Sequence, residues 1–238
     1  MILSELIYRH FFRGSIVRKM SGATIHISDN AIIRNSRIVA SPGTNIIIKD
    51  KCVIENVEIY LSKGSVIIGD NSILSGRKNE KLKIIVNNGI IEIADHTKLS
   101  CRRLWLRFGG SLIIGRYTNI NEGSEIRCDE CVEIGSYNQI SYNVRIWDTN
   151  THSILDAAER RRVTEARFPY FGYESERPVT APVKIGNDCW IGENAAILKG
   201  TELDDGSVVG FGTFLTNKKI PVGARVVNER PIRVVSIK

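Results

Sequence analysis

The stretch that decides the fold runs over residues 185–220 and reads IGNDCW IGENAA ILKGTE LDDGSV VGFGTF LTNKKI. Each of its hexapeptides opens with an aliphatic residue: Ile185, Ile191, Ile197, Leu203, Val209 and Leu215. Four positions after each of the first five stands a small residue: Cys189, Ala195, Thr201, Ser207 and Thr213. Neither the helical period of 3.6 nor the strand period of 2 explains a strict period of six. This period is typical of a parallel β-helix, in which three hexapeptides complete one triangular coil.

The period continues upstream in a less regular form. Similar corners begin at intervals of 20 to 25 residues: Ile27, Ile48, Ile68, Ile93, Ile114 and Ile134. Each interval is about one coil plus a bulge or a small loop. We therefore predict an all-β fold, a parallel β-helix solenoid over 24–222, with an N-terminal capping segment at 1–23 and a C-terminal tail at 223–238. Such a fold stacks its strands around a column of aliphatic side chains and needs no large helical core.

Composition narrows the class of protein. The chain has 238 residues, of which 42% are hydrophobic, and this disfavours a disordered protein. No stretch approaches the roughly 18–20 apolar residues that a transmembrane helix needs. Lys and Arg total 33 against 26 Asp and Glu, a net charge of +7, which favours an anionic partner. Because no nucleic-acid-binding motif is present, a phosphorylated co-substrate or an acidic glycan is the better interpretation.

The cysteines and the first residues add two expectations. Five scattered cysteines do not form a disulfide framework, so we expect a reducing, cytoplasmic environment. Cys128 and Cys131 form a CxxC motif, but no second pair follows, so we expect no metal site. The segment 3–12 is amphipathic and is expected to cover the end of the solenoid as a short helix; a peripheral contact with a membrane surface is the alternative.

The repeat is interrupted once. It stops after Trp147 and resumes at Val183, so we predict a protruding loop over 148–182. The loop carries aromatic residues, and its arginines are balanced by acidic residues. A long loop on a rigid scaffold is usually functional. It opens with Asp-Thr-Asn-Thr-His at 148–152, which contains His152.

The repeats and this D-x-N-x-H segment resemble the hexapeptide acyltransferases, in particular the galactoside, maltose and capsule or O-antigen O-acetyltransferases. The resemblance implies a left-handed coil, an exception to the usual crossover rule, and a homotrimer with active sites between subunits. It implies acetyl-CoA as the co-substrate. His152 would be the general base that deprotonates an acceptor hydroxyl as it attacks the thioester. Asp148 is a candidate to orient its ring, and Trp190 would lie near the histidine of the facing subunit.

The resemblance also implies binding residues. For the acceptor these are Asn121, Asp129, Asn143 and Asn150, although asparagine and aspartate also favour corners for structural reasons. For acetyl-CoA they are Ala195, Gly210, Phe211, Gly212, Thr216, Lys218, Lys219 and Arg233. Phe211 stands where the family usually has alanine, so the contact there is altered. Lys218, Lys219 and Arg233 would pair with CoA phosphates.

The leading hypothesis is an O-acetyltransferase of a saccharide, with a cell-surface polysaccharide as acceptor. One alternative is an N-acetyltransferase of a nucleotide-linked amino sugar; another is a non-catalytic solenoid scaffold. The scaffold would need none of His152, Trp190 and Arg233 together. The γ-type carbonic anhydrases share the fold but need three histidine ligands, and the four histidines of this chain are too scattered for that site.

Overall fold

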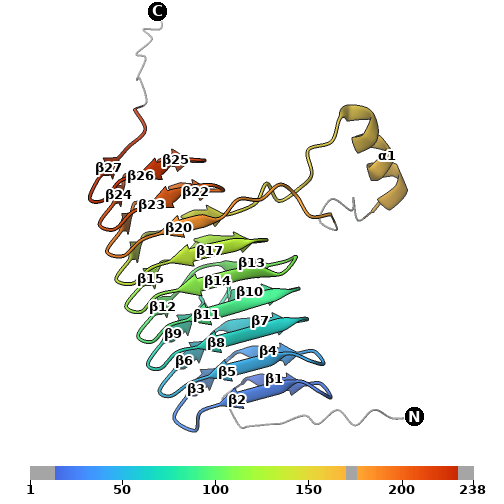
Figure 1. Cartoon of the computed structure of the whole chain (residues 1–238). Helices are drawn as coiled ribbons and strands as arrows, with labels where there is room; N and C mark the ends of the chain where they lie inside the picture. The colour runs from blue at the N-terminus through green and yellow to red at the C-terminus, as the bar shows by residue number, and fades with distance from the viewer. Residues whose placement is uncertain (1–13, 170–175, 230–238) are drawn as a thin grey trace, which may run out of the picture.

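The computed structural model describes residues 14–169 and 176–229. Over these residues the chain winds into a stack of triangular coils, and each side of the triangle is a nine-stranded parallel sheet (Figure 1). We call the three sides sheets A, B and C. Successive strands go to A, B and C in turn, so each strand pairs with the strand three places along the chain. The predicted all-β solenoid of hexapeptide coils is confirmed.

The strands have the following bounds. Sheet A contains β1 (Ile16–Lys19), β4 (Arg37–Ala40), β7 (Val57–Leu61), β10 (Leu82–Val86), β13 (Arg103–Leu106), β16 (Glu125–Cys128), β19 (Arg145–Trp147), β22 (Ala196–Leu198) and β25 (Phe214–Leu215). Sheet B contains β2 (Thr24–Ile27), β5 (Asn45–Ile48), β8 (Gly64–Ile68), β11 (Gly89–Ile93), β14 (Gly110–Ile114), β17 (Cys131–Ile134), β20 (Val183–Ile185), β23 (Glu202–Leu203) and β26 (Lys219–Ile220). Sheet C contains β3 (Ile32–Arg34), β6 (Val53–Glu55), β9 (Ile73–Ser75), β12 (Lys98–Leu99), β15 (Asn119–Ile120), β18 (Gln139–Ile140), β21 (Trp190–Ile191), β24 (Val208–Val209) and β27 (Arg225–Val226).

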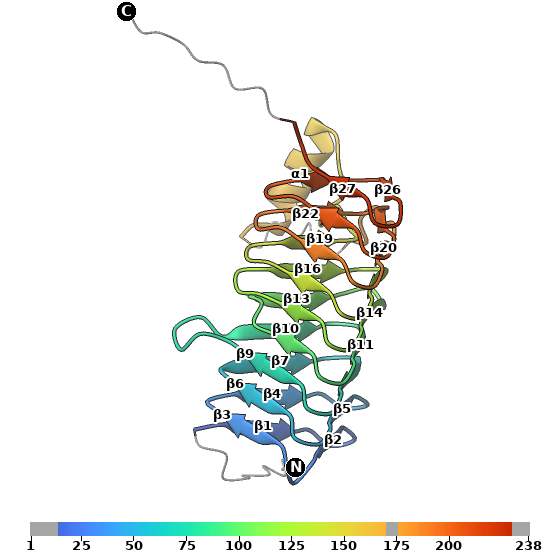
Figure 2. The same ribbon diagram turned by 90° about the vertical axis from the view of Figure 1, so that its left-hand side faces the viewer.

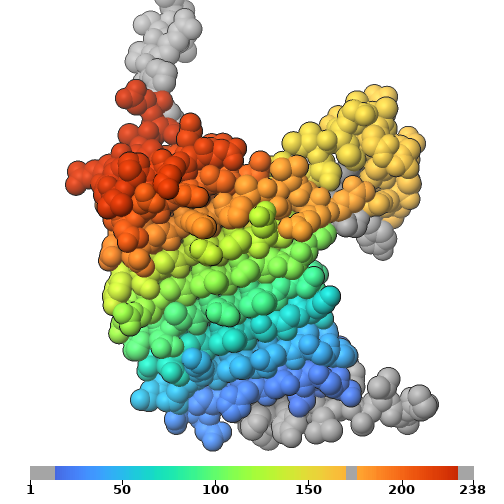
Figure 3. Space-filling view, in the orientation of Figure 1, coloured from blue at the N-terminus to red at the C-terminus, as the bar shows by residue number. Residues whose placement is uncertain are grey.

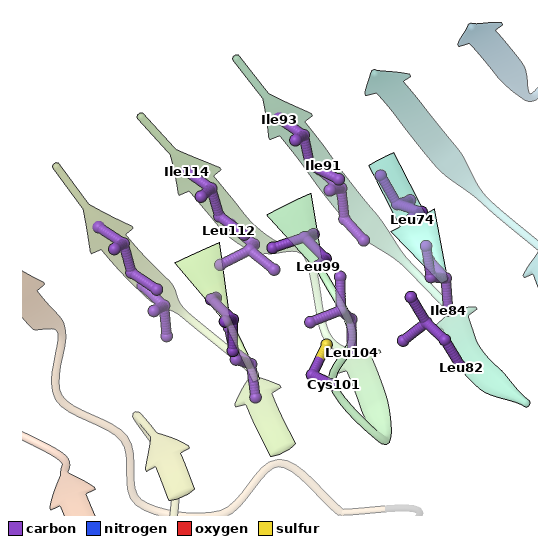
Figure 4. Close-up of a cluster of buried hydrophobic side chains, with 14 of the residues drawn as sticks. Leu74, Leu82, Ile84, Ile91, Ile93, Leu99, Cys101, Leu104, Leu112 and Ile114 are labelled. Carbon is purple, nitrogen blue, oxygen red and sulfur yellow. The ribbon is translucent and has the colours of Figure 1, made fainter. Parts of the chain in front are cut away.

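The core is the aliphatic column that the period of six predicts. Ile185, Ile191 and Ile197 point inward from sheets B, C and A in turn, and all three are buried. The column continues down the stack, where Leu74, Ile91 and Leu104 fill the interior (Figure 4). Removing such side chains from water supplies roughly 25 cal/mol per Å² of apolar surface, and each coil also stabilises its neighbours by parallel strand pairing.

Most corners between sheets are tight turns. At the edge between sheets C and A, Asn35, Asn56, Asn143 and Asn194 have positive φ angles of 45°, 55°, 57° and 60°. Asparagine tolerates this left-handed conformation better than most residues. The side chains also pair up the stack, since Asn35 Nδ2 donates to Asn56 Oδ1 at 2.6 Å. A corner asparagine in this fold therefore has a structural reason to be there.

The predicted protrusion of 148–182 contains a helix that the sequence reading missed, α1 (Ala157–Arg167). It stands away from the side of the stack in Figures 1 and 3, and in the view of Figure 2 it lies behind the upper coils. Asp156 caps its N-terminus by accepting from Glu159 N at 2.9 Å. Only Val163 of the helix is buried, so the segment has no apolar stripe to reveal it.

The coils extend slightly past the predicted limits of 24–222. β1 begins at Ile16 and β27 ends at Val226. The capping segment and the tail otherwise fall largely outside the described residues, and the domain boundaries stay a prediction. Among residues 14–169 and 176–229, no helix is both long and apolar enough to cross a membrane.

Candidate functional site

The loop leaves the stack at the edge between sheets A and B, directly after β19. Its first residue, Asp148, is buried, and its carboxylate holds the corner of the coil below. Oδ1 accepts from Asp129 N at 2.8 Å, and Oδ2 accepts from Glu130 N at 2.8 Å and Cys131 N at 2.7 Å. Burial raises the pKa of Asp148 above its ordinary value, against the opposing effect of these three N–H groups. These contacts give Asp148 a structural task at the root of the loop.

A buried ion pair lies beneath this corner. Arg107 Nε donates to Asp129 Oδ1 at 2.9 Å, and Nη2 donates to Oδ2 at 2.6 Å, a bidentate arrangement. Thr149 Oγ1 donates to Asp129 Oδ2 at 2.7 Å. Asp129 is 1% exposed and Arg107 5% exposed. The carboxylate that was predicted to bind the acceptor therefore lies below the surface and binds Arg107 and Thr149 here.

Two arginines then fix the residue before His152. Arg107 Nη2 also donates to the Thr151 carbonyl oxygen at 3.1 Å, and Arg127 Nη1 donates to Thr151 Oγ1 at 3.1 Å. Thr151 itself has φ = +71°, which is rare for a β-branched residue and costs of order 1–3 kcal/mol. A strained conformation persists only where its surroundings hold it, and here the two guanidinium groups do so. His152 follows at once and is exposed to solvent.

The same arginines take part in an aromatic cluster on the outer face of sheet A. The Arg127 guanidinium lies over the Trp147 ring, 4.1 Å from its centroid, and 5.4 Å from the Trp105 centroid. Glu125 accepts from Arg127 Nε at 2.5 Å and from Arg103 Nη2 at 2.6 Å. Burial alone would raise the pKa of Glu125, but the hydrogen bonds from Arg103 and Arg127 outweigh it and hold that pKa below its ordinary value. The carboxylate therefore stays charged at neutral pH.

The far end of the loop closes on its start. Thr149 and Thr180 form an isolated antiparallel bridge, and Asn150 N donates to Val179 O at 3.1 Å. Thr180 Oγ1 donates to a carboxylate oxygen of Glu130. The two ends of the excursion are thus tied to one another and to the corner below, so His152 is held close to the A/B edge.

The other predicted catalytic and acceptor residues lie elsewhere. Trp190, in β21, is 59% exposed and faces outward from sheet C, which is the side of the triangle opposite the A/B edge. Asn121 and Asn143 lie at the C/A edge, where Asn121 Oδ1 accepts from Asn119 Nδ2 at 3.1 Å. Of the predicted catalytic and acceptor residues, only Asp148, Asp129 and Asn150 share the edge of His152. A single chain does not bring the whole predicted set together.

The predicted acetyl-CoA residues are also divided between two edges. Ala195, Gly210, Phe211 and Gly212 lie at the C/A corners next to β22 and β25, and Phe211 is exposed whereas Ala195 is buried. Thr216 and Lys218 lie at the A/B edge beyond β25. Lys219, the first residue of β26, forms an ion pair with Glu202 at 3.4 Å. Arg233 lies outside the described residues. All eight assignments stay predictions.

Sequence reasoning missed Arg107, Arg127, Trp105 and Thr151. Their juxtaposition depends on the register of stacked coils, in which Trp105 pairs with Arg127 and Arg127 with Trp147. These positions are 22 and 20 residues apart, about one coil each. Aligning the coils by their aliphatic positions would have placed these three side chains in one outward column.

Comparison with known proteins shows which family shares this repeat. A family model described as bacterial transferase hexapeptide (six repeats) matches residues 182–217. These residues therefore carry the hexapeptide repeat of that transferase family. The chain is 29% identical over 160 residues to "Putative acetyltransferase YvoF" of Bacillus subtilis (strain 168), covering 66% of this chain and 79% of that protein. The prediction of an acyltransferase is confirmed at this level.

Another relative has a named acceptor. The polysialic acid O-acetyltransferase of Escherichia coli O1:K1 / APEC is 30% identical over 93 residues, covering 39% of this chain and 26% of that protein. Among solved structures, the polySia-specific acetyltransferase NeuO has 25% identity and a TM-score of 0.45, over 87% of this chain and 78% of that one. The polysialic acid O-acetyltransferase OatWY has 21% identity and a TM-score of 0.41, over 90% and 80%. These overall likenesses in shape are weak, so the sequence relatives carry the comparison.

The five cysteines of the chain are all free thiols, and burial raises the pKa of Cys128 and also that of Cys101, the latter to about 12. Among residues 14–169 and 176–229, no group of three His, Cys, Asp or Glu side chains is arranged to hold a metal ion.

Proposed function

We propose that the chain transfers an acetyl group from acetyl-CoA to a hydroxyl of an acidic saccharide, a cell-surface polysaccharide of the capsule or O-antigen type. The observation that carries the proposal is the fixed root of the loop, where Arg107 and Arg127 clamp the residue next to exposed His152. The family supplies the acyl donor, the polysialic acid relative suggests the acceptor class, and the net charge of +7 suits an anionic polymer.

In the proposed mechanism His152 acts as the general base. Its imidazole takes the proton of the acceptor hydroxyl while the oxygen attacks the thioester carbonyl carbon of acetyl-CoA. The tetrahedral intermediate collapses, the C–S bond breaks, and the imidazolium returns the proton to the leaving CoA thiolate. The products are the acetyl ester and CoA–SH. Asp148 contributes by fixing the corner from which the histidine projects.

We further propose that the site is completed by a second copy of the chain, in a homotrimer. His152 lies four residues from Asp148, so its tether reaches at most about 14 Å from the A/B edge. Trp190, Asn143 and Gly210–Gly212 lie on other sides of the same stack. In the proposed trimer a neighbouring copy presents its own A/B edge, and with it a histidine, to these groups.

The direct test measures CoA release with polysialic acid, with a neutral polysaccharide and with a nucleotide-linked amino sugar. We expect His152→Ala to lose turnover with polysialic acid by about 10²–10⁴-fold, the usual contribution of general-base catalysis. Unchanged turnover in His152→Ala would refute the mechanism. A preference for the amino sugar would favour N-acetyl transfer, and no turnover with any acceptor would favour the scaffold.

The shared site has its own test. Inactive His152→Ala and inactive Trp190→Ala chains are unfolded together, refolded and assayed. If each site uses the histidine of one copy and the tryptophan of another, the mixture regains part of the wild-type activity, because some interfaces then carry both intact residues. Mixed chains that stay as inactive as either variant alone would place both residues in one chain's site.

A further inference from the structure

A hollow outside the predicted site opens in the A/B edge, beneath the root of the loop. It has a volume of about 370 Å³ and is lined by Asn87, Asn88, Trp105, Arg107 and Phe108. Asn87 and Asn88 form the corner after β10, and Arg107 and Phe108 form the corner after β13. No role in the proposed transfer has so far been assigned to this hollow.

Its lining has the chemistry of a sugar site. Aromatic rings offer a flat apolar surface on which the C–H face of a pyranose packs, and amides both donate to and accept from hydroxyl groups. Trp105, whose ring Arg103 and Arg107 partly cover, and Phe108 supply the aromatic surface, and Asn87 and Asn88 supply the amides. Trp105 Nε1 donates to Asn87 Oδ1 at 2.9 Å. This bond orients the amide of Asn87 and holds the indole in place.

Three arginines surround Trp105. Their guanidinium groups lie within 5.4 Å of its ring centroid: Arg103 at 4.8 Å, Arg107 at 4.6 Å and Arg127 at 5.4 Å. They pair with the two carboxylates of Glu125 and Asp129. The guanidinium groups therefore outnumber the carboxylates that they bind, and partly buried arginines suit planar carboxylates.

The hollow is also connected to the candidate catalytic residue. Arg107 lines it and donates to the carbonyl oxygen of Thr151, next to His152. Trp105 lies in β13, two coils below β19, and strands in a sheet are spaced about 4.8 Å apart, so the vertical separation is about 10 Å. One sugar ring does not span this separation, whereas neighbouring units of a chain do.

We propose that the hollow is a second acceptor subsite, which holds an acidic sugar unit of the same polymer whose neighbouring unit is acetylated at His152. The inference rests on the proposed function and makes it more specific, since the enzyme then prefers a chain to a single sugar. Packing against the exposed parts of Trp105 and Phe108, hydrogen bonds to Asn88 and the arginines around Trp105 bind the distal unit, and the covalent chain brings its neighbour to the loop.

The test compares long and short polysialic acid fragments as acceptors of the full-length protein. In the wild type kcat/KM is expected to be higher for long fragments. Trp105→Ala and Asn88→Ala are each expected to raise KM for long fragments about tenfold. The ratio of kcat/KM for long fragments to kcat/KM for short fragments then falls toward one. Tyr60→Ala is the matched control, because Tyr60 is an aromatic residue of the same outward column in β7. Urea unfolding of each variant confirms that it folds.

Titration of long fragments into the protein without acetyl-CoA separates this inference from the proposed function. Transfer that depends on His152, with a long-to-short ratio unchanged in Trp105→Ala and Asn88→Ala, would overturn the subsite and leave the proposed function standing. Fragment binding that Trp105→Ala weakens, in a protein that never transfers acetyl, would support the subsite and overturn the proposed function. A ratio near one in the wild type, with binding unaffected by either substitution, would also refute the subsite.

Discussion

Replacing Asp148 tests whether this carboxylate holds the corner or serves the histidine. It accepts from the backbone N–H groups of Asp129, Glu130 and Cys131 at 2.7–2.8 Å, and it is buried. Leaving a buried donor without its acceptor costs about 1–3 kcal/mol. Water can enter the emptied corner and replace part of the loss, so we expect Asp148→Ala to lower the free energy of unfolding by about 3 kcal/mol rather than by three full penalties.

Amide hydrogen exchange locates the effect, because in a stacked solenoid a local contact can open without unfolding distant coils. We expect the amides of residues 129–131 to lose protection in Asp148→Ala, while those of β5 and β8 keep theirs. Asp148→Asn retains one acceptor oxygen, so its amide protection at 129–131 should lie between that of the wild type and that of Asp148→Ala. Asp156→Ala is the control: it removes a carboxylate from the same loop, costs about 1 kcal/mol through the cap of α1, and leaves the corner intact.

If Asp148→Asn keeps wild-type unfolding and wild-type protection at 129–131 but loses kcat a hundredfold, the carboxylate acts on the histidine and the corner bonds are incidental. A fall of kcat in step with the loss of protection supports the structural task.

Further substitutions test the packing, the charges and the thiols. Gly110→Ala should lower the free energy of unfolding in urea by more than about 3 kcal/mol, because its Cβ would lie 2.4 Å from Cys128 O. In the control Gly43→Ala the new Cβ meets nothing within 4 Å, so only the strain at φ = +74° remains, about 1 kcal/mol. The pKa of Glu125 is lowered in the folded state, so its contribution to stability is complete above pH 4.5 and is lost as the pH falls through the folded-state pKa. In urea unfolding measured against pH, Glu125→Gln should therefore show a smaller loss of stability at acid pH than the wild type. Cys131 is the one half-buried thiol of five, so the native protein should react slowly with one equivalent of a thiol reagent and the unfolded protein with five; rapid reaction of several native thiols would contradict the packing.

The fold was predictable because the geometry of the coil imposes a period of six residues on the sequence. Every sixth residue must point inward, and even Leu215, near the end of the stack, is only 4% exposed. The helix α1 was not predictable from periodicity, because it packs only Val163 and has no apolar face. Its signals were local: the N-cap Asp156 and the ion pair of Glu159 with Arg162.

The candidate site was predictable only in part, for a different reason. The position of His152 at the break of the repeat is a one-dimensional signal. The clamp on Thr151 is not, because Arg107 is 44 residues away along the chain and reaches it only through the stacking of coils. Asp129 illustrates the same limit: its type suited a sugar ligand, but the register placed it under Arg107.

The buried pair of Arg107 and Asp129 raises the question of why a charged pair lies where apolar residues would serve stability equally well. Removing one partner of such a pair costs about 3–5 kcal/mol, whereas replacing both with apolar residues of similar size is often neutral or stabilising. We therefore expect Asp129→Leu alone to destabilise the protein strongly, and the combination of Arg107→Met with Asp129→Leu to restore nearly wild-type unfolding in urea.

The double variant still loses the hydrogen bond from Arg107 to the Thr151 carbonyl oxygen, so the strained turn before His152 is released. Its single-turnover rate of acetyl transfer should stay low although its stability is recovered. A double variant that recovers both stability and rate would mean that the pair serves folding alone; recovery of stability without rate would mean that the charges are kept to fix the direction in which the histidine leaves the stack.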